Sequence, residues 1–305
     1  MSARTIRRAQ HGFTLVEAVL VIAIIGILGA IVAVFLRAPI QGYVDSVARA
    51  ETTDDADLAL RRMARDIRLA LPNSVRVNAN GDAIEFLMTS TGGRYLAADE
   101  GAAGTNPLDF ENSANRAFDV VGWVRADINV GDLVVVYNLG PGIEPVDAYQ
   151  INAAGAFRNA ARVAARVTKN SDIDTATRTI LLADNPFAQQ SEPMPSPSRR
   201  FQVVSGAVSY RCEGTPGNFV LRRYEGYTIT PAMSAAAPTG GRVATMATRV
   251  STCANLFRYD NALDNADNLQ VRASALVILT LALRTRNGTD PAVRLVHQVH
   301  VDNTP

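Results

Sequence analysis

The carboxylate of Glu17 is the most informative charged group near the N-terminus, because it borders a long run of apolar residues. The run from Ala18 to Leu36 contains no charge, and it is long enough to cross a bilayer. A charged side chain inside a membrane costs roughly 2.5 kcal/mol or more unless something pairs with it. The sequence therefore predicts a cationic partner for Glu17. An amino terminus created by a cut between Gly12 and Phe13 would supply that positive charge.

The partner of Glu17 would come from another copy of the chain. If neighbouring helices stack with an axial offset, the free nitrogen of Phe13 on one copy can neutralise Glu17 on the next. The apolar segment must therefore stay attached after the cut. An ordinary secretory signal fits poorly, because the apolar run is longer than usual, carries Glu17 and lacks a small-x-small cleavage site after it.

The flanking charges predict the orientation of this segment. Arginines stand before the span at positions 4, 7 and 8, and Arg37 follows it. The excess of positive charge on the leader places the N-terminus in the cytoplasm and the remainder of the chain outside.

The N-terminal residues also resemble a known signal. The sequence Gly12-Phe13-Thr14-Leu15-Val16-Glu17, with its basic leader and apolar run, resembles the N-termini of type IV pilins and type II secretion pseudopilins. This resemblance implies that prepilin peptidase cuts between Gly12 and Phe13 and that the new N-terminal Phe13 is methylated. An ordinary signal anchor with a stray Glu is the alternative.

After the apolar run the chain becomes amphipathic. Leu60, Met63, Ile67 and Leu71 recur at helical spacing and mark one face. The pattern predicts one helix from Phe13 to Leu71, about 85–90 Å long at 1.5 Å per residue. It should bend near Pro39 and end before Pro72, whose ring disfavours helix at the preceding residue.

Beyond residue 73 the pattern changes to short runs of β-branched and aromatic residues separated by turn residues. We predict an α+β fold, in which antiparallel strands pack on the second half of the helix. The candidate strands are Ser74–Val77, Ala83–Met88, Phe118–Val124, Asp132–Tyr137, Arg162–Thr168, Arg178–Leu182, Phe201–Val204, Ala207–Arg211, Phe219–Tyr224, Ser274–Arg286 and Ala292–Val301. A hairpin connection at residues 287–291 would join the last two.

These patterns divide the chain into four parts. They are a leader at 1–12, a transmembrane and assembly helix at 13–36, an amphipathic continuation at 37–72, and a β-rich periplasmic head at 73–305. A proline-rich stretch at 185–200 predicts a boundary between two lobes of the head, and residues 231–242 predict a second long loop.

Composition narrows the possible functions. The 305 residues carry a formal net charge of +1, which argues against a generic nucleic-acid binder.

The only two cysteines, Cys212 and Cys253, lie in the part predicted to be outside the cytoplasm, where oxidising conditions would join them. Closing a loop of about 42 residues would stabilise the fold by roughly 4 kcal/mol. Two separate buried thiols are the alternative.

A further resemblance covers much of the mature chain. Several blocks resemble the O component of the mannose-sensitive haemagglutinin (MSHA) pilus biogenesis system, and the stretch from about 97 to 200 resembles it least. The blocks are residues 37–43, 65–77, 84–86, 93–95, 208–212, 224–227 and 297–305. That family is similar to the larger, J-component pseudopilin of type II secretion.

The resemblance implies a minor pilin that starts or caps a fibre, first anchored by one span in the inner membrane and then placed in the pilus. Its implied partners are prepilin peptidase, other minor and major pilins, the inner-membrane assembly platform and membrane lipid. The alternatives are a type II secretion pseudopilin and a tip adhesin that binds a surface glycan or DNA. Neighbouring genes for pilus assembly or for secretion would distinguish the minor pilin from the secretion pseudopilin.

The sequence supplies no recognisable catalytic site, so we expect neither an enzyme nor a cofactor. His297 and His300 stand three apart in a predicted strand and should point to opposite faces. Asp260, Asp264 and Asp267 offer oxygen ligands for calcium but lack the spacing of a calcium-binding loop, so a solvated loop is favoured and no metal is expected. Aromatic residues beside arginines could stack on single-stranded DNA, but alternating strand faces explain them more simply, and we expect no nucleic-acid partner. They are Tyr210, Arg211, Arg222, Arg223 and Tyr224.

Overall fold

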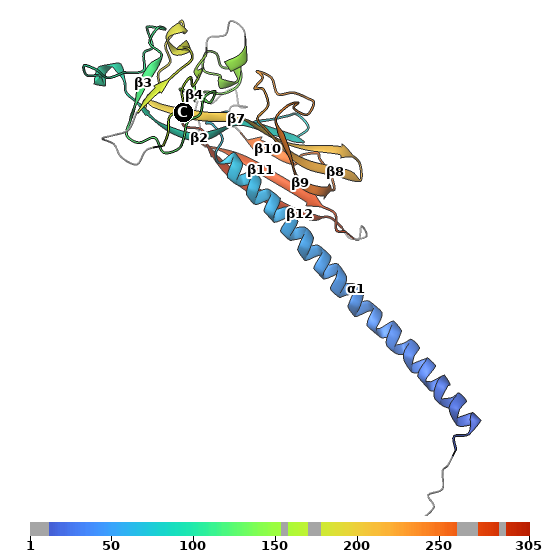
Figure 1. Ribbon diagram of the computed structural model, residues 1–305. Coiled ribbons are helices and arrows are strands. Elements are labelled where there is room, and N and C mark those ends of the chain that lie inside the picture. The colour runs from blue at the N-terminus through green and yellow to red at the C-terminus, as the bar shows by residue number, and fades with distance from the viewer. Residues whose placement is uncertain (1–11, 154–157, 170–177, 261–273, 287–290) are drawn as a thin grey trace, which may run out of the picture. The chain divides into compact units, whose positions relative to one another are not determined.

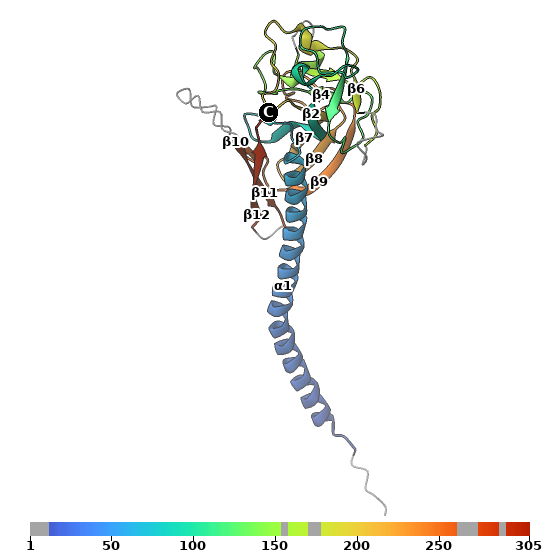
Figure 2. The same ribbon diagram turned by 90° about the vertical axis from the view of Figure 1, so that its left-hand side faces the viewer.

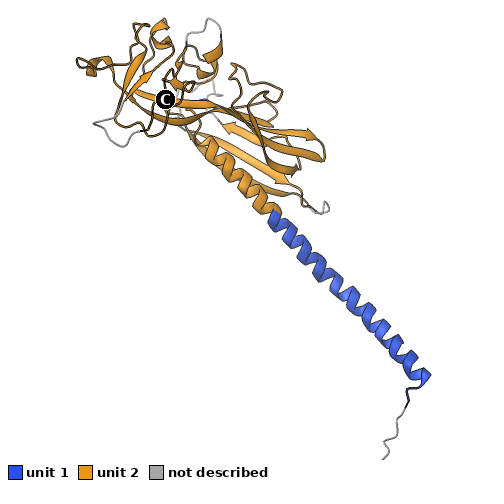
Figure 3. Cartoon of the chain, in the orientation of Figure 1, with its two compact units in different colours: residues 1–51 blue, residues 52–305 orange. Residues whose placement is uncertain are grey.

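The computed structural model describes residues 12–153, 158–169, 178–260, 274–286 and 291–305 (Figure 1). The chain forms two compact units, residues 1–51 and residues 52–305 (Figure 3). One long N-terminal helix is followed by a large antiparallel sheet, so the fold is α+β, with the helix packed on a β head, as the sequence predicts. The predicted hairpin connection at 287–291 and the acidic residues Asp264 and Asp267 fall largely or wholly outside the described residues.

Helix α1 spans Leu15–Ile67 without interruption, and Pro39 lies inside it. Its most apolar 18-residue window has a mean hydropathy of 3.2, and none of that window is buried within the protein. Among the described residues, α1 is the one helix long and apolar enough to cross a membrane. This helix therefore supports membrane anchoring by length and composition.

The helix ends at Ile67, four residues before the predicted end at Leu71. The backbone N–H of Leu71 donates to the carbonyl of Leu87 (2.7 Å), and that of Thr89 donates to the carbonyl of Leu69 (2.8 Å). The N–H of Leu71 and the carbonyl of Leu69 thus bond to the neighbouring strand before Pro72 is reached, whereas the N–H groups of Leu69 and Ala70 donate to Asp66 and Ile67 in a tighter turn. The prediction from proline alone was wrong because the sheet competes for these hydrogen bonds.

Within the described residues the strands form one twelve-stranded sheet whose main path runs β10-β11-β9-β8-β7-β2-β3-β6. All of the pairings in it are antiparallel. The strands are β1 (Arg76–Val77), β2 (Ala83–Tyr95), β3 (Ala117–Val121), β4 (Leu133–Val135), β5 (Ala160–Arg162), β6 (Thr179–Leu181), β7 (Arg200–Thr215), β8 (Asn218–Glu225), β9 (Arg242–Val250), β10 (Phe257–Asp260), β11 (Ser274–Leu283) and β12 (Val293–Asp302). Short 3-10 helices lie at Ala98–Glu100 (η1), Ala148–Asn152 (η2) and Pro186–Gln189 (η3).

Several strands differ from the predicted ones. The two segments predicted on either side of Ser205 are one continuous strand, β7, because register shifts opposite Met88 and Thr89 let β2 and β7 stay paired through an irregularity. Strand β5 lies before most of the segment predicted at 162–168. The strands β9 and β10 were not predicted, because β9 is rich in Ala and Thr and β10 has only four residues.

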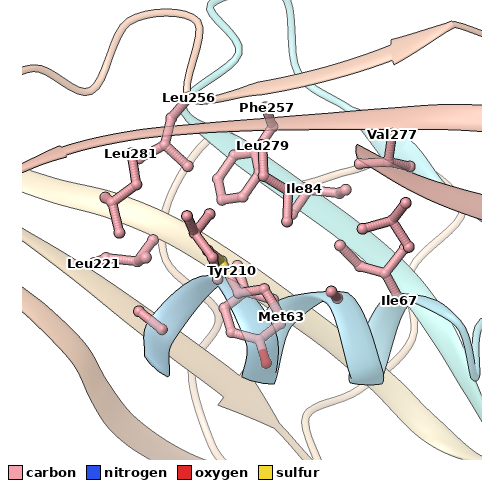
Figure 4. Packing of buried hydrophobic residues seen from close by; sticks show 14 of the residues in the cluster. Met63, Ile67, Ile84, Tyr210, Leu221, Leu256, Phe257, Val277, Leu279 and Leu281 are labelled. Atoms are coloured by element: carbon pink, nitrogen blue, oxygen red, sulfur yellow. The ribbon is translucent and has the colours of Figure 1, made fainter. Parts of the chain in front are cut away.

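The main core lies between the end of α1 and the sheet. Leu60, Met63 and Ile67 are at most 2% exposed, so the predicted apolar face of the helix is confirmed. Figure 4 shows Met63 beside Tyr210 and the apolar side chains of strands across the core. In Figures 1 and 2, β7 lies beside the C-terminal turns of α1. These turns therefore form one layer of the head.

Two further apolar clusters occupy the rest of the head. One joins residues between Tyr95 and Val203 and includes Phe118, Phe187 and Phe201. The other surrounds Tyr149. Both β2 and β7 contribute to the main core and to the cluster around Phe118, so long strands link the regions. The lobe boundary at 185–200 remains a prediction.

A buried ionic network ties α1 to β7 and β8. The Tyr210 hydroxyl (2.7 Å) and the Arg223 Nε (2.8 Å) both donate to Oδ2 of Asp66. Arg223 also pairs with Glu225. Burial, and next the charge of Asp66, raise the pKa of the Tyr210 hydroxyl, so Tyr210 stays protonated and acts as a donor. Each charge in the buried group therefore has a partner, as burial requires.

A disulfide joins Cys212, in β7, to Cys253, which follows β9, with the two Cα atoms 5.4 Å apart. Cys212 belongs to the main core and Cys253 packs against it. The bond thus connects two neighbouring parts of the sheet across 41 residues of chain.

We expect Asp66→Ala to lower the free energy of unfolding by about 3 kcal/mol, because Tyr210 and Arg223 lose their shared buried acceptor. The matched control is Asp57→Ala, which removes an exposed ion pair with Arg61 on the same helix and should cost under about 1 kcal/mol. Urea unfolding of the full chain in detergent measures both variants. Equal midpoints for the two would contradict a structural role for the Asp66 network.

We expect non-reducing peptide mapping to recover Cys212 and Cys253 as one linked peptide. Replacing both by Ala should lower the free energy of unfolding by roughly 4 kcal/mol, because the unfolded chain gains the freedom of an open loop. Alkylation of both thiols in unreduced protein would contradict this pairing.

Candidate functional site

The predicted processing site lies at the start of α1. Helix α1 begins at Leu15, and the Oγ1 of Thr14 accepts a hydrogen bond from the backbone N–H of Glu17 at 3.3 Å. The carbonyl of Thr14 accepts from the N–H of Ala18 at 3.2 Å. Thr14 therefore caps the helix. Sequence reasoning missed this role, although a Thr followed three residues later by a Glu is the spacing of a capping box.

Glu17 lies in the first turn of the helix. A carboxylate there interacts favourably with the partial positive charge of the helix N-terminus. Among the described residues no cationic side chain pairs with Glu17, and its side chain is exposed. A full positive charge for Glu17 would thus have to come from outside the described part of the chain.

The bond between Gly12 and Phe13 is sterically open. Phe13 is 79% exposed, and a Cβ added at Gly12 would meet no heavy atom within 4 Å. The structure places Phe13 and Glu17 at the same end of α1, within about one helical turn of each other. Their roles in cleavage, methylation and assembly remain predictions.

The helix that follows has an apolar surface all around it. Every residue from 12 to 44 is exposed within this chain. A helix that is apolar on all sides needs a surrounding of lipid or of other apolar helices. Large apolar residues on this surface include Leu15, Val19, Ile22, Ile25, Leu28, Ile31 and Phe35.

The other candidate residues do not form a chemical site. His297 is half-buried and His300 is exposed, and they point to opposite faces of β12. Asp260 is an exposed residue at the end of β10, whereas its proposed calcium-binding companions lie outside the described residues. Within the described part of the chain, no group of three or more His, Cys, Asp or Glu residues is placed to hold a metal.

The aromatic and arginine residues considered for DNA stacking are mostly inside the head. Tyr210, Arg211, Arg223 and Tyr224 are each at most 8% exposed. Tyr210 and Arg223 bind Asp66, and the Tyr224 hydroxyl donates to Glu213. These side chains are therefore structural and cannot stack on a nucleic acid without leaving the core.

Comparison with known proteins adds to this geometry. The prokaryotic N-terminal methylation motif matches residues 7–33, which contain the Gly12–Phe13 bond, Glu17 and the start of α1. The comparisons with curated proteins and with solved structures found no match. The matched signal indicates a structural, non-enzymatic protein. The chain thus carries the prepilin signal of a type IV pilin-like protein, which implies processing by prepilin peptidase and assembly with other pilins.

Proposed function

We propose that this chain is a minor pilin of an MSHA-type pilus that acts in the initiation or at the tip of the fibre. The observation that carries the proposal is the methylation motif at residues 7–33 on a helix whose apolar surface is uncovered. The resemblance of several head segments to the O component of MSHA biogenesis supports the finer assignment.

In this proposal the chain is made as a precursor in the inner membrane. Residues 13–36 span the membrane, the head lies in the periplasm, and prepilin peptidase removes residues 1–12. Phe13 is then methylated on its amine. The inner-membrane assembly platform extracts the processed helix from lipid, and the surface of residues 13–36 packs against the helices of sibling pilins.

Charge pairing between subunits would fix the axial position of each helix. Glu17 follows Phe13 by about one helical turn, so a neighbour displaced by roughly that distance along the axis would bring the two charges together. A pair in an apolar environment is strong only while both partners are present. This requirement would make the offset between subunits specific.

The size of the head supports a low-abundance position. Residues 52–305 form a single compact unit. A head of that size packs poorly when it is repeated at every position of a tight helical shaft. An initiating or terminal position tolerates such a head. A pseudopilin of type II secretion would have the same N-terminal features, and the MSHA-like head segments favour the pilus.

We expect Gly12→Ala, and any larger substitution, to leave an uncut precursor in the membrane. The structure around Gly12 is open, so the added methyl group disturbs no contact of the chain itself and acts on the fit to the peptidase. The matched control is Gly42→Ala, a helical glycine with equally open surroundings, which should be processed normally. Intact mass and N-terminal sequencing measure both. Efficient cleavage of Gly12→Ala, or cleavage of the unaltered chain at another bond, would contradict the proposal.

We expect Glu17→Gln and Glu17→Val to be inserted and cut normally but to fail in assembly. Either change removes the carboxylate without altering the cleavage site, and it makes the span less polar. The control Asp54→Asn removes an exposed carboxylate farther along the same helix and should assemble normally.

Two measurements test this assembly defect. Crosslinking to sibling pilins reports whether the helix still packs, and counts of surface fibres report whether assembly starts. Unchanged crosslinks with normal fibre numbers in Glu17→Val would show that the carboxylate is no assembly determinant. The assembly failure is expected for an initiating subunit that later has a neighbour above it. At the top of a fibre Glu17 has no subunit above it, so in a tip subunit Glu17→Val should leave both the crosslink made through its Phe13 end and the number of fibres unchanged.

A further inference from the structure

A cleft on the head combines an exposed tryptophan with two arginines, Arg125 and Arg200, that no described side chain pairs. It has a volume of about 760 Å³ and is lined by segments of β2, β7 and the turn after β3. Gly92 and Arg94 come from β2, and Arg200 and Gln202 come from β7. We propose that this cleft binds an acidic saccharide through its carboxylate and one sugar ring.

The strand pairing explains why these side chains share one face. Arg94 is paired with Arg200 on one side and with Val121 on the other, and Gly92 is paired with Gln202. The intervening residue Phe201 points the opposite way, into the core. The alternation of strand faces therefore places the polar residues together on the outer side of the sheet.

The pairing of Arg94 with Arg200 brings like charges to directly opposite positions, which is unfavourable by itself. Arg94 is neutralised by an ion pair with Glu100. No described side chain forms an ion pair or hydrogen bond with the guanidinium group of Arg200 or of Arg125. Two cations at the cleft thus have no anionic partner among the described side chains, and a guanidinium fork is suited to binding a carboxylate through two hydrogen bonds.

The turn after β3 presents the aromatic surface. Gly122 has a φ of 97°, a conformation that favours glycine, and it turns the chain so that Trp123 remains 50% exposed at the cleft. Gly92 leaves room for the side chain of Gln202 in the cleft, because an added Cβ at Gly92 would lie 2.5 Å from Oε1 of Gln202. An indole face offers a flat apolar surface, and the C–H face of a pyranose ring packs on such a surface.

These features favour a saccharide over single-stranded DNA. Binding of a nucleic acid uses a basic groove with successive stacking platforms, whereas this cleft has one exposed aromatic ring. The Gln202 amide and the Ser198 hydroxyl can exchange hydrogen bonds with sugar hydroxyls. This binding would give the proposed pilin an adhesive head. The inference rests on the proposed function only in one respect, which is that the pilus would present the head outside the cell.

The single tryptophan of the chain makes the test direct. We expect tetragalacturonate to change the fluorescence of Trp123 saturably when it is added to the full chain in detergent. The fully methyl-esterified tetramer keeps the shape of the ligand but removes its charge, and it should bind about tenfold more weakly. Arg200→Gln and Arg125→Gln should weaken tetragalacturonate binding by a similar factor. Arg258→Gln, an exposed strand arginine outside the cleft, should leave binding unchanged.

Three results would overturn the proposal. They are the absence of a saturable change, equal binding of the charged and esterified tetramers, and a response to an eight-residue thymidine oligonucleotide that exceeds the response to tetragalacturonate. Far-UV circular dichroism of each variant shows whether it is folded. Because the purified chain is used, these outcomes do not depend on cleavage at Gly12, and normal processing with no saccharide binding would remove this inference alone.

Discussion

The buried side of α1 between residues 52 and 67 is the surface on which the main core of the head is assembled. Small residues at Ala56, Ala59 and Ala64 are buried there beside Met63 and Ile67. Small side chains let the backbone of the helix approach a sheet closely, and the larger ones fill the spaces that remain. If this layer were removed, apolar side chains from the middle of the sheet would face water.

The ionic network makes the position of this layer specific. Apolar packing alone tolerates rearrangement, whereas Asp66 has to meet both Tyr210 and Arg223. A displacement of the helix along the sheet would leave charges buried without partners, which is costly. The disulfide acts on a different element, because it connects β7 to the chain after β9. The ionic network and the disulfide therefore both hold β7, through Tyr210 and Cys212.

The N-terminal half of α1 follows a different physical rule. Residues 13–36 are all exposed within the described part of the chain, so their apolar side chains need an environment of lipid or other helices. The carboxylate of Glu17 is tolerated at the helix N-terminus, where Thr14 caps the first turn. One continuous helix thus combines a segment whose partners lie outside the chain with a segment whose partners are the strands of the head.

The sequence alone determined the features that depend on local pattern. The Gly12-Phe13 signal with Glu17 is a contiguous motif, and the spacing of Leu60, Met63 and Ile67 follows directly from helical periodicity. Alternating apolar residues predicted most long strands, and with only two cysteines the disulfide had one possible pairing. Tertiary structure decided the features that depend on residues distant in the chain. The helix ends early because the Leu69 carbonyl and the Leu71 N–H bond to β2. Strand β9 forms because it pairs with β8, although its own sequence has little strand preference. The partners of Asp66 are more than 140 residues away, and strand register alone sets Arg94 opposite Arg200 beside Trp123. Periodicity shows which face of an element a residue occupies, but only the folded sheet determines which other residue it meets there.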